Sequence, residues 1–265
     1  MTPRPKAPYT VAVIDVGDCH SVGCPQVTGR YASRRLGGQP LPLRIARRLG
    51  ESTRIGHVAI TGAHLPASLL VSGAPHVDVL DLPYGHVCER MAAVADKFDA
   101  DWIVYVPGNH PFVDPALIDC LVNRAYQSPD VVDYVGYSNA NGQWEHVRHL
   151  GVAGEVIHAD ALRRLRRNID RVDARDTDLS LADWLDRVPG NYERRFVRIP
   201  DALDRPDLRF AIVDELDFER AEMFSDSVGD ESTEWQSLAQ LVRDNESLRG
   251  AMAERNQFAQ TLNSL

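Results

Sequence analysis

Lysine is almost missing from this sequence of 265 residues. Of its 29 basic residues only Lys6 and Lys97 are lysines, so the chain relies on arginine for positive charge. The 38 acidic residues bring the formal net charge at pH 7 to -9. Because neutralisation of phosphates by basic residues supplies most of the affinity for nucleic acid, we expect no nucleic-acid partner. Any phosphate bound here is expected to be met by arginine or by backbone N–H groups.

Long apolar runs are absent, and cysteine is scarce. No stretch of about 18 consecutive apolar residues occurs, so we expect neither a membrane span nor a signal peptide. Cys19, Cys24, Cys88 and Cys120 are scattered along the chain, which is typical of a reduced, cytoplasmic protein. Cys19, His20 and Cys24 lie close together and leave a metal site open as an alternative, although their spacing matches no common zinc pattern.

Helical and strand-like patterns alternate through the first half of the sequence. Asp114 is a plausible N-cap, because it precedes a proline that can open a helix. Strands alternating with helices of this length favour a parallel sheet with helices on both faces. The predicted strands cover residues 9–16, 57–61, 77–80, 102–106 and 131–137, and the predicted helices cover residues 42–49, 84–98 and 115–126.

The second half has shorter predicted elements, separated by polar stretches. We therefore expect mixed strand pairing late in the sheet. The fold class predicted from the whole pattern is α/β, with three layers and a mostly parallel mixed sheet flanked by helices. The additional strands are predicted at residues 154–158, 196–199 and 210–213, and the additional helices at 159–167 and 176–187.

The last segment, residues 231–265, has a heptad pattern. This pattern predicts two units, an α/β domain of residues 1–228 and a coiled-coil-like helix of residues 229–265. An asparagine at an a position commonly fixes the register of a two-stranded coil, so we expect a homodimer through this helix. The alternative is a helix that packs on its own domain. The a and d positions hold Leu238, Leu241, Asn245, Leu248, Met252, Ala259 and Leu262, with Arg255 interrupting the series.

The strand predicted at residues 102–106 ends in a distinctive motif. Pro107-Gly-Asn-His-Pro111 is followed by an apolar pair and then by Asp114-Pro115, which opens a helix. This motif resembles the Gly-Asp-x-Pro strand end of nucleotide-sugar cytidylyltransferases, including CMP-sugar synthetases and the spore-coat polysaccharide branch. The resemblance implies a nucleotide-diphospho-sugar transferase-like fold with its ligands at the carboxyl ends of the central strands.

Other segments resemble the same family in the same order, so the resemblance covers about residues 9–225. Arg90 lies on the helix where the family often has an arginine. The remaining matches are the Leu-Gly-Gly-Gln-Pro-Leu segment at 36–41, Asp-Tyr-Val at 133–135, the Glu-Val strand and Ala-Leu helix within 150–162, and Phe-Ala-Ile-Val-Asp-Glu-Leu-Asp-Phe at 210–218.

The resemblance implies transfer of CMP from CTP to a sugar or sugar acid, as in nucleotide-sugar and surface polysaccharide biosynthesis. A divalent ion, Mg²⁺, would stabilise the charge on the phosphates, and it prefers oxygen ligands. The implied metal ligands are Asn109, Asp214 and Asp217, and the implied catalytic residues are Asp214 and Arg34. The implied nucleotide contacts are Val16, Gly17, Ser21, Gly23, Gln39, Gly108 and Asn109, and the implied substrate contacts are Glu155, Tyr137 and Arg90.

The sequence departs from this family where charge matters most. Asn109 stands where the family has a metal-binding aspartate, and Gln39 stands where it has a lysine. The loop after the first strand carries Asp15 and Asp18, whose carboxylates would repel a triphosphate. A second hypothesis is therefore a catalytically degenerate relative that acts as a nucleotide- or sugar-binding or assembly subunit. A sugar transferase is less consistent, because Asp99-Ala-Asp101 precedes its strand and does not end it.

Overall fold

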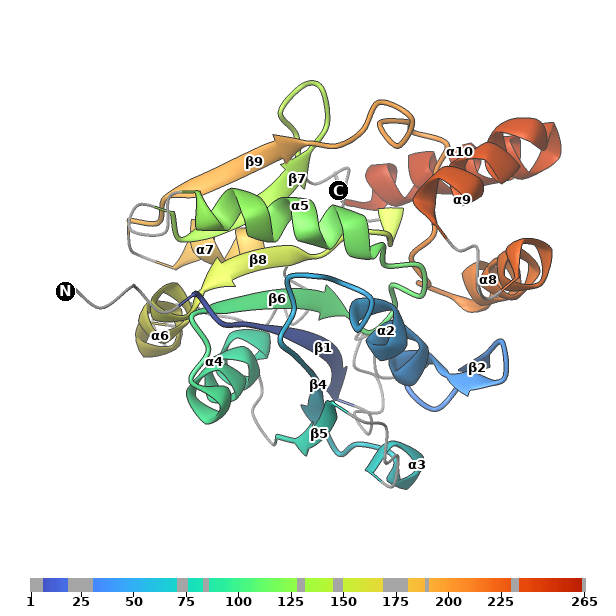
Figure 1. The fold of residues 1–265 in the computed structure, drawn as a ribbon. Coiled ribbons are helices and arrows are strands. Elements are labelled where there is room, and N and C mark those ends of the chain that lie inside the picture. The colour runs from blue at the N-terminus through green and yellow to red at the C-terminus, as the bar shows by residue number, and fades with distance from the viewer. Residues whose placement is uncertain are drawn as a thin grey trace.

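A computed structural model describes residues 7–18, 31–70, 76–82, 86–127, 132–144, 150–168, 181–188, 191–229 and 234–263 of the chain. These residues form three layers, with a twisted central sheet between two layers of helices (Figure 1). The sheet order is β5-β4-β1-β6-β8-β7-β9, and β8 runs antiparallel to both of its neighbours while the other pairings are parallel. The predicted fold class is confirmed.

The strands match the predicted ones closely in the first half of the chain. The buried valines and isoleucines of β1 and β6 account for their central position, because a parallel strand covered on both faces reads as a continuous apolar run. The sheet strands are β1 (Thr10–Asp18), β4 (His57–Ala63), β5 (Val77–Asp81), β6 (Trp102–Pro107), β7 (Tyr134–Ser138), β8 (Glu155–His158) and β9 (Arg194–Arg198), and a small hairpin joins β2 (Arg35–Leu36) to β3 (Gln39–Pro40).

Two hydrophobic cores lie on the two faces of the sheet. Along β1, Ala12 and Ile14 pack into one core while Val11 and Val13 pack into the other, as the two-residue repeat of a strand requires. The first core contains α2 (Leu41–Leu49), α3 (Ala67–Leu70), α5 (Pro115–Tyr126), α8 (Glu215–Val228), α9 (Trp235–Asp244) and α10 (Glu246–Asn263). The second contains α4 (Val87–Phe98), α6 (Ala159–Asn168) and α7 (Leu181–Arg187).

Residues 210–213 do not form the predicted strand. Residues 210–212 are buried, but the backbone hydrogen bonds of this segment reach two separate loops: Phe210 N donates to Leu150 O at 3.2 Å, and Ile212 N donates to Asn109 O at 2.9 Å. The segment therefore crosses the region where β6 ends and leads into α8. Its apolar residues resemble a strand because they cover the core at this place, without pairing along a neighbouring strand.

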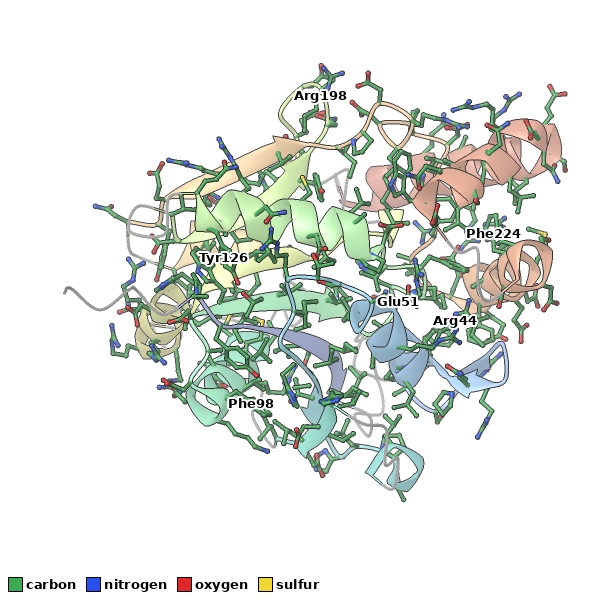
Figure 2. All side chains as sticks on the ribbon, viewed as in Figure 1. Arg44, Glu51, Phe98, Tyr126, Arg198 and Phe224 are labelled. Carbon is green, nitrogen blue, oxygen red and sulfur yellow. The ribbon has the colours of Figure 1, made fainter. Side chains whose placement is uncertain are left out.

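An aromatic cluster fixes this crossing segment and α8 to the rest of the domain. Phe224 of α8, labelled in Figure 2, packs edge-to-face against Phe112 and Phe210, with ring centroids 6.0 and 5.3 Å away. The guanidinium of Arg44, on α2, lies 6.0 Å from the centre of the Phe112 ring. Helices from both ends of the chain thus meet near the motif that follows β6.

The C-terminal segment is two helices, not one. Asn245 ends α9 in an extended conformation, and its Oδ1 accepts a hydrogen bond of 3.0 Å from Leu248 N at the start of α10. Leu238, Leu248 and Met252, which follow the heptad pattern, are buried in the core of their own chain. The coiled-coil interpretation is therefore wrong for these residues, and the alternative of packing on the same domain is correct.

Two further features concern the class of protein. Within the described residues, no helix combines the length and apolar character needed to cross a membrane. Cys88 and Cys120 are free thiols, and Cys88 is buried. The alternative metal site at Cys19, His20 and Cys24 lies outside the described residues.

Candidate functional site

The carboxyl ends of β1, β4 and β6 meet at one edge of the sheet. Asp15 on β1 is in register with Thr61 on β4 and with Pro107 on β6. Gly62 and Gly108 directly follow the latter two residues, and Gly17 lies two residues after Asp15. A Cβ atom on Gly62 would lie 2.6 Å from Gly17 O, and one on Gly108 would lie 2.7 Å from Val16 Cγ1. Side chains do not fit at these positions, because the Val16 side chain and neighbouring backbone already fill the space. Open α/β sheets bind their ligands at this edge.

The predicted nucleotide contacts on this edge are partly brought together. Val16, Gly17 and Gly108 converge there, but the Val16 side chain is fully buried, so only its backbone faces the edge. Gly17 has a φ of 68°, a left-handed conformation that favours glycine. Ser21 and Gly23 lie outside the described residues.

Arg90 and Asp15 form a buried ion pair beneath this edge. Arg90 Nε donates to Asp15 Oδ1 at 2.7 Å and Arg90 Nη2 to Oδ2 at 2.8 Å, and the two side chains are 1% and 6% exposed. Burial lowers the pKa of Arg90, but the Asp15 carboxylate outweighs it and the net pKa is raised. Arg90 is therefore not the free substrate contact that we predicted. In turn, Asp15 is neutralised and is not the repelling carboxylate that we expected.

Asn109 joins the end of β6 to the segment that leads into α8. Its Nδ2 donates to Ile212 O at 2.9 Å, and its backbone oxygen accepts from Ile212 N at 2.9 Å. Its side-chain Oδ1 is buried and has no hydrogen-bond partner. The amide thus holds the late segment with its nitrogen and leaves its oxygen unused. An aspartate here could not donate to Ile212 O.

His110, which we did not single out from the sequence, is buried next to Asn109. Its Nδ1 lies 3.1 Å from Ala153 O, so the neutral tautomer with a proton on Nδ1 fits the site. Burial lowers the pKa of His110 to about 4, against a smaller opposing effect of the Ala153 carbonyl. His110 is therefore neutral at pH 7 and links β6 to the start of β8. Its place in the strand-end motif was the available signal.

Asp217 is enclosed by basic groups. Its carboxylate, 4% exposed, accepts from Arg209 Nη2 at 2.9 Å and from Val213 N at 3.1 Å, and Arg220 lies 3.7 Å away. With these partners Asp217 is not available as the metal ligand that we predicted. It is a structural carboxylate that holds the first turn of α8 against the segment before it.

Asp214, by contrast, is partly exposed. Its Oδ1 caps α8 by accepting a 3.0 Å hydrogen bond from Asp217 N, and its Oδ2 contacts Arg255 of α10. One oxygen of the carboxylate therefore caps the N-terminus of α8 and stabilises the helix. The other oxygen is paired with an arginine from the C-terminal helix, a partner that no sequence pattern predicted.

Arg34 meets the same turn of α8 from the opposite end of the sequence. Both of its terminal nitrogens lie 3.0 Å from the Glu215 carboxylate, and its guanidinium stacks 3.9 Å above the Phe218 ring. The hydrogen bonds to Glu215 raise the pKa of Arg34, and burial only weakly opposes them. The structure thus brings the predicted catalytic residues Arg34 and Asp214 to one helix terminus.

Glu155 and Tyr137 lie on different faces of the sheet. Glu155, half-buried at the start of β8, accepts hydrogen bonds from Tyr134 OH at 3.0 Å and from Ala182 N at 3.3 Å. Tyr137 is buried under α5 and donates to Leu117 O at 2.9 Å. The prediction of Tyr137 as a substrate contact is therefore wrong, because the alternation along β7 turns it into the core.

Gln39 lines a groove whose described lining residues include none of the glycines at the strand edge. It belongs to β3, and the groove, of about 940 Å³, runs along α2 and is also lined by Leu43, Ile55, His57 and Val77. Contact with a nucleotide at Gln39 therefore stays a prediction.

The residues implied as metal ligands do not form a suitable set. In the part of the chain that the structure describes, no group of three or more His, Cys, Asp or Glu side chains could hold a metal ion. Asn109 offers one uncharged oxygen, Asp217 is saturated, and Asp214 carries Arg255. A hard divalent ion prefers several oxygen ligands, usually including carboxylates, so these residues do not fit a resident Mg²⁺.

The fold is similar to that of cytidylyltransferases of known structure. A cytidylyltransferase from Leptospira borgpetersenii serovar Hardjo-bovis (strain JB197) superposes with a TM-score of 0.69 over 91% of this chain and 95% of its own, at 15% identity. A CMP:2-keto-3-deoxy-manno-octonic acid synthetase complexed with CTP gives a TM-score of 0.53 over 84% of this chain and 99% of its own, at 11% identity. At these identities the similarity establishes the fold.

One curated protein is similar in sequence. The spore coat polysaccharide biosynthesis protein SpsF of Bacillus subtilis (strain 168) is 25% identical over 144 residues, which cover 54% of this chain and 55% of that protein. The chain thus spans about half the length of the relative that it matches. No family model matches the sequence. The resemblance to nucleotide-sugar cytidylyltransferases, inferred from the motifs, is confirmed by this similarity and by the fold.

Proposed function

We propose that this protein is a cytidylyltransferase that transfers CMP from CTP to a sugar or sugar acid, in the synthesis of nucleotide sugars for a surface polysaccharide. The observation that carries the proposal is the meeting of Gly17, Gly62 and Gly108 at the carboxyl ends of the central parallel strands, the edge at which open α/β sheets bind their ligands. The similarity to a protein of spore-coat polysaccharide biosynthesis and to cytidylyltransferase structures supports it.

The chemistry requires one bond to form and one to break. An oxygen of the sugar attacks the α-phosphorus of CTP, and the bond to the pyrophosphate breaks, so that pyrophosphate leaves. In this proposal the backbone of Val16, Gly17 and Gly108 lies against the nucleotide, and Glu155 orients the sugar. Arg34 and Asp214 act at the first turn of α8, where positive charge can stabilise the phosphates.

In this proposal Mg²⁺ binds together with CTP. It keeps several waters and is commonly bound through substrate phosphates together with one or two carboxylates. Because Asn109, Asp214 and Asp217 do not form a free ligand set, we place Mg²⁺ on the phosphates of CTP, without a resident protein site.

We also propose a cytoplasmic location and a homodimer. CTP is a cytoplasmic metabolite, and Cys88 and Cys120 are free thiols, as expected in a reducing compartment. Because Leu238, Leu248 and Met252 of the heptad pattern are buried, an interface would involve another surface, and α8 exposes the apolar side chains of Leu216 and Met223. Light scattering on the whole chain and on Leu216→Lys tests the dimer: a doubled mass that the variant halves supports it, and a monomeric mass contradicts it.

Pyrophosphate release tests the proposed reaction directly. The whole chain is incubated with CTP, Mg²⁺ and a panel of sugar acids and sugar phosphates, and inorganic pyrophosphate is measured with a coupled assay. We expect sugar-dependent release that falls strongly in Arg34→Gln and stays near wild type in Arg35→Gln, an exposed neighbour used as the charge-matched control. CTP binding with no release for any sugar of the panel would instead favour a binding subunit.

A further inference from the structure

Arg255 of α10 occupies a position between two carboxylates. Its Nη2 contacts Asp214 Oδ2, and its Nε lies 3.5 Å from Asp217 Oδ1. Asp214 is the carboxylate for which the family resemblance implies a divalent cation. In this chain the positive charge beside that carboxylate belongs to the protein itself.

The helix that carries Arg255 is anchored on both sides of this residue. Met252, one turn earlier, is fully buried in the core. Asn256, the next residue, donates from Nδ2 to Pro206 O at 2.8 Å and to Leu208 O at 3.0 Å. These contacts fix α10 to the segment that leads into α8, so Arg255 is held in place by its neighbours as well as by Asp214.

A guanidinium and a divalent cation compete for the same carboxylate. Asp214 Oδ1 caps α8 by accepting from Asp217 N, and Asp214 Oδ2 accepts from Arg255 Nη2. A cation bound there would lose the Oδ2 ligand and would lie within a few ångströms of a positive charge. At such distances the repulsion costs about 1 kcal/mol per pair of unit charges even in water. The other carboxylate of the pair, Asp217, is already bound by Arg209.

We propose that Arg255 is the cation of this site, so that Asp214 is neutralised by an arginine of the C-terminal helix and binds no metal. This rests in part on the proposed function, since its consequence concerns the nucleotide: Arg255 paired with Asp214, and Arg34 paired with Glu215, place guanidinium donors and no net charge at the first turn of α8. Arginine meets phosphate with a planar pair of donors, a role that suits a chain nearly without lysine. The same contact explains why Arg255 interrupts the heptad pattern.

Binding of Mn²⁺ alone, followed through the electron paramagnetic resonance signal of the free ion, tests the proposal without nucleotide. The whole chain is compared with Arg255→Gln, with Arg255→Lys, and with Arg243→Gln, an exposed arginine of α9 that serves as the charge-matched control. We expect Arg255→Gln to bind Mn²⁺ about tenfold more tightly than wild type, because one repelling charge is gone and one oxygen is freed. Arg255→Lys and Arg243→Gln should behave like wild type, and Asp214→Asn added to Arg255→Gln should abolish the gain.

Three results would overturn the proposal. They are wild-type binding of Mn²⁺ as tight as in Arg255→Gln, a gain that persists without the Asp214 carboxylate, and no binding in any variant. A comparison of wild type with Asp214→Asn adds a readout that does not require Arg255→Gln to fold: the two titrations should superimpose, and tighter binding by wild type would contradict the proposal. CTP titration of wild type separates the two claims, because absence of CTP binding overturns the proposed function while the Mn²⁺ result still decides the role of Arg255.

Discussion

Arg90 and Asp15 form a two-pronged ion pair directly below the carboxyl edge of β1, with both side chains almost fully buried. The pair ties α4 to the central strand at the position where the glycine-lined edge begins. From the sequence we had predicted Arg90 to contact the substrate and Asp15 to repel a triphosphate. In the structure the two side chains pair with each other. Because Arg90 neutralises the Asp15 carboxylate, this residue adds little negative charge to the strand edge.

Breaking this pair should be costly. Asp15→Asn removes the carboxylate that pairs with the buried Arg90 guanidinium, so we expect a loss of about 3–5 kcal/mol in the free energy of unfolding. Urea unfolding of wild type and variant measures it. The control is the exposed ion pair between Arg198 and Asp201, of which Arg198 is labelled in Figure 2. Arg198→Gln should change the free energy of unfolding by less than about 1 kcal/mol. Equal effects of the two substitutions would contradict the account.

His110 should make stability depend on pH. Its pKa in the folded chain is about 4, against an ordinary value of 6.5, so the unfolded chain binds more protons between these values. Stability is complete above about pH 6.5 and falls as pH drops toward 4, by up to about 3 kcal/mol. Urea unfolding of wild type and His110→Gln at several pH values measures the difference between their pH slopes. A variant with the wild-type slope would show that His110 titrates normally.

Gly108 should tolerate no side chain. A Cβ there would lie 2.7 Å from Val16 Cγ1 and 3.0 Å from Asp15 O, so Gly108→Ala must shift β1 against β6. We expect a loss of about 1–3 kcal/mol in stability, together with weaker CTP binding. Gly250→Ala is the matched control: it lies on α10 with open space around it and should stabilise by up to about 1 kcal/mol. Thermal unfolding and calorimetry provide the two readouts.

Asn109→Asp introduces the aspartate that the resembling cytidylyltransferases have at this position, but it removes the donor to Ile212 O. The new carboxylate would face that carbonyl, so we expect a loss of about 1–3 kcal/mol in stability at pH 7. Burial beside a carbonyl should raise the pKa of this aspartate, and its protonated form can donate again, so the loss should shrink as pH falls toward about 4. Unfolding at two pH values measures this. A variant as stable as wild type at pH 7 would mean that the hydrogen bond to Ile212 contributes nothing.

The sequence predicted the fold well where apolar pattern and strand position agree. The continuous apolar runs of β1 and β6 identified the central parallel strands, and Asp114 was correctly identified as the cap of α5. The segment at 210–213 was misassigned, because burial against loops and burial within a sheet leave the same apolar pattern. The C-terminal heptad was misassigned because a stripe on one helix cannot tell a second chain from the same chain's core.

The site was predicted less completely than the fold. The strand-end motif was correctly expected to follow the strand that became β6, because it depends on neighbours in sequence, while the binding roles of Gly108 and Asn109 stay predictions. The sequence pattern could not predict ion pairs between residues far apart in the chain, because these depend on how helices and strands pack. The examples are Arg90 with Asp15, Arg34 with Glu215 and Arg255 with Asp214. A sequence motif identifies a charged residue, but it does not show whether that residue is already paired with another side chain. That pairing decides whether the residue can bind a ligand.

Calorimetric titration of the whole wild-type chain with CTP in the presence of Mg²⁺ tests the central claim most directly, namely that the glycine-lined edge is a cytidine nucleotide site. The account predicts saturable binding at one site per chain, weaker for Gly108→Ala and unchanged for Gly250→Ala. Absence of heat with millimolar CTP, or identical binding by Gly108→Ala and wild type, would contradict it.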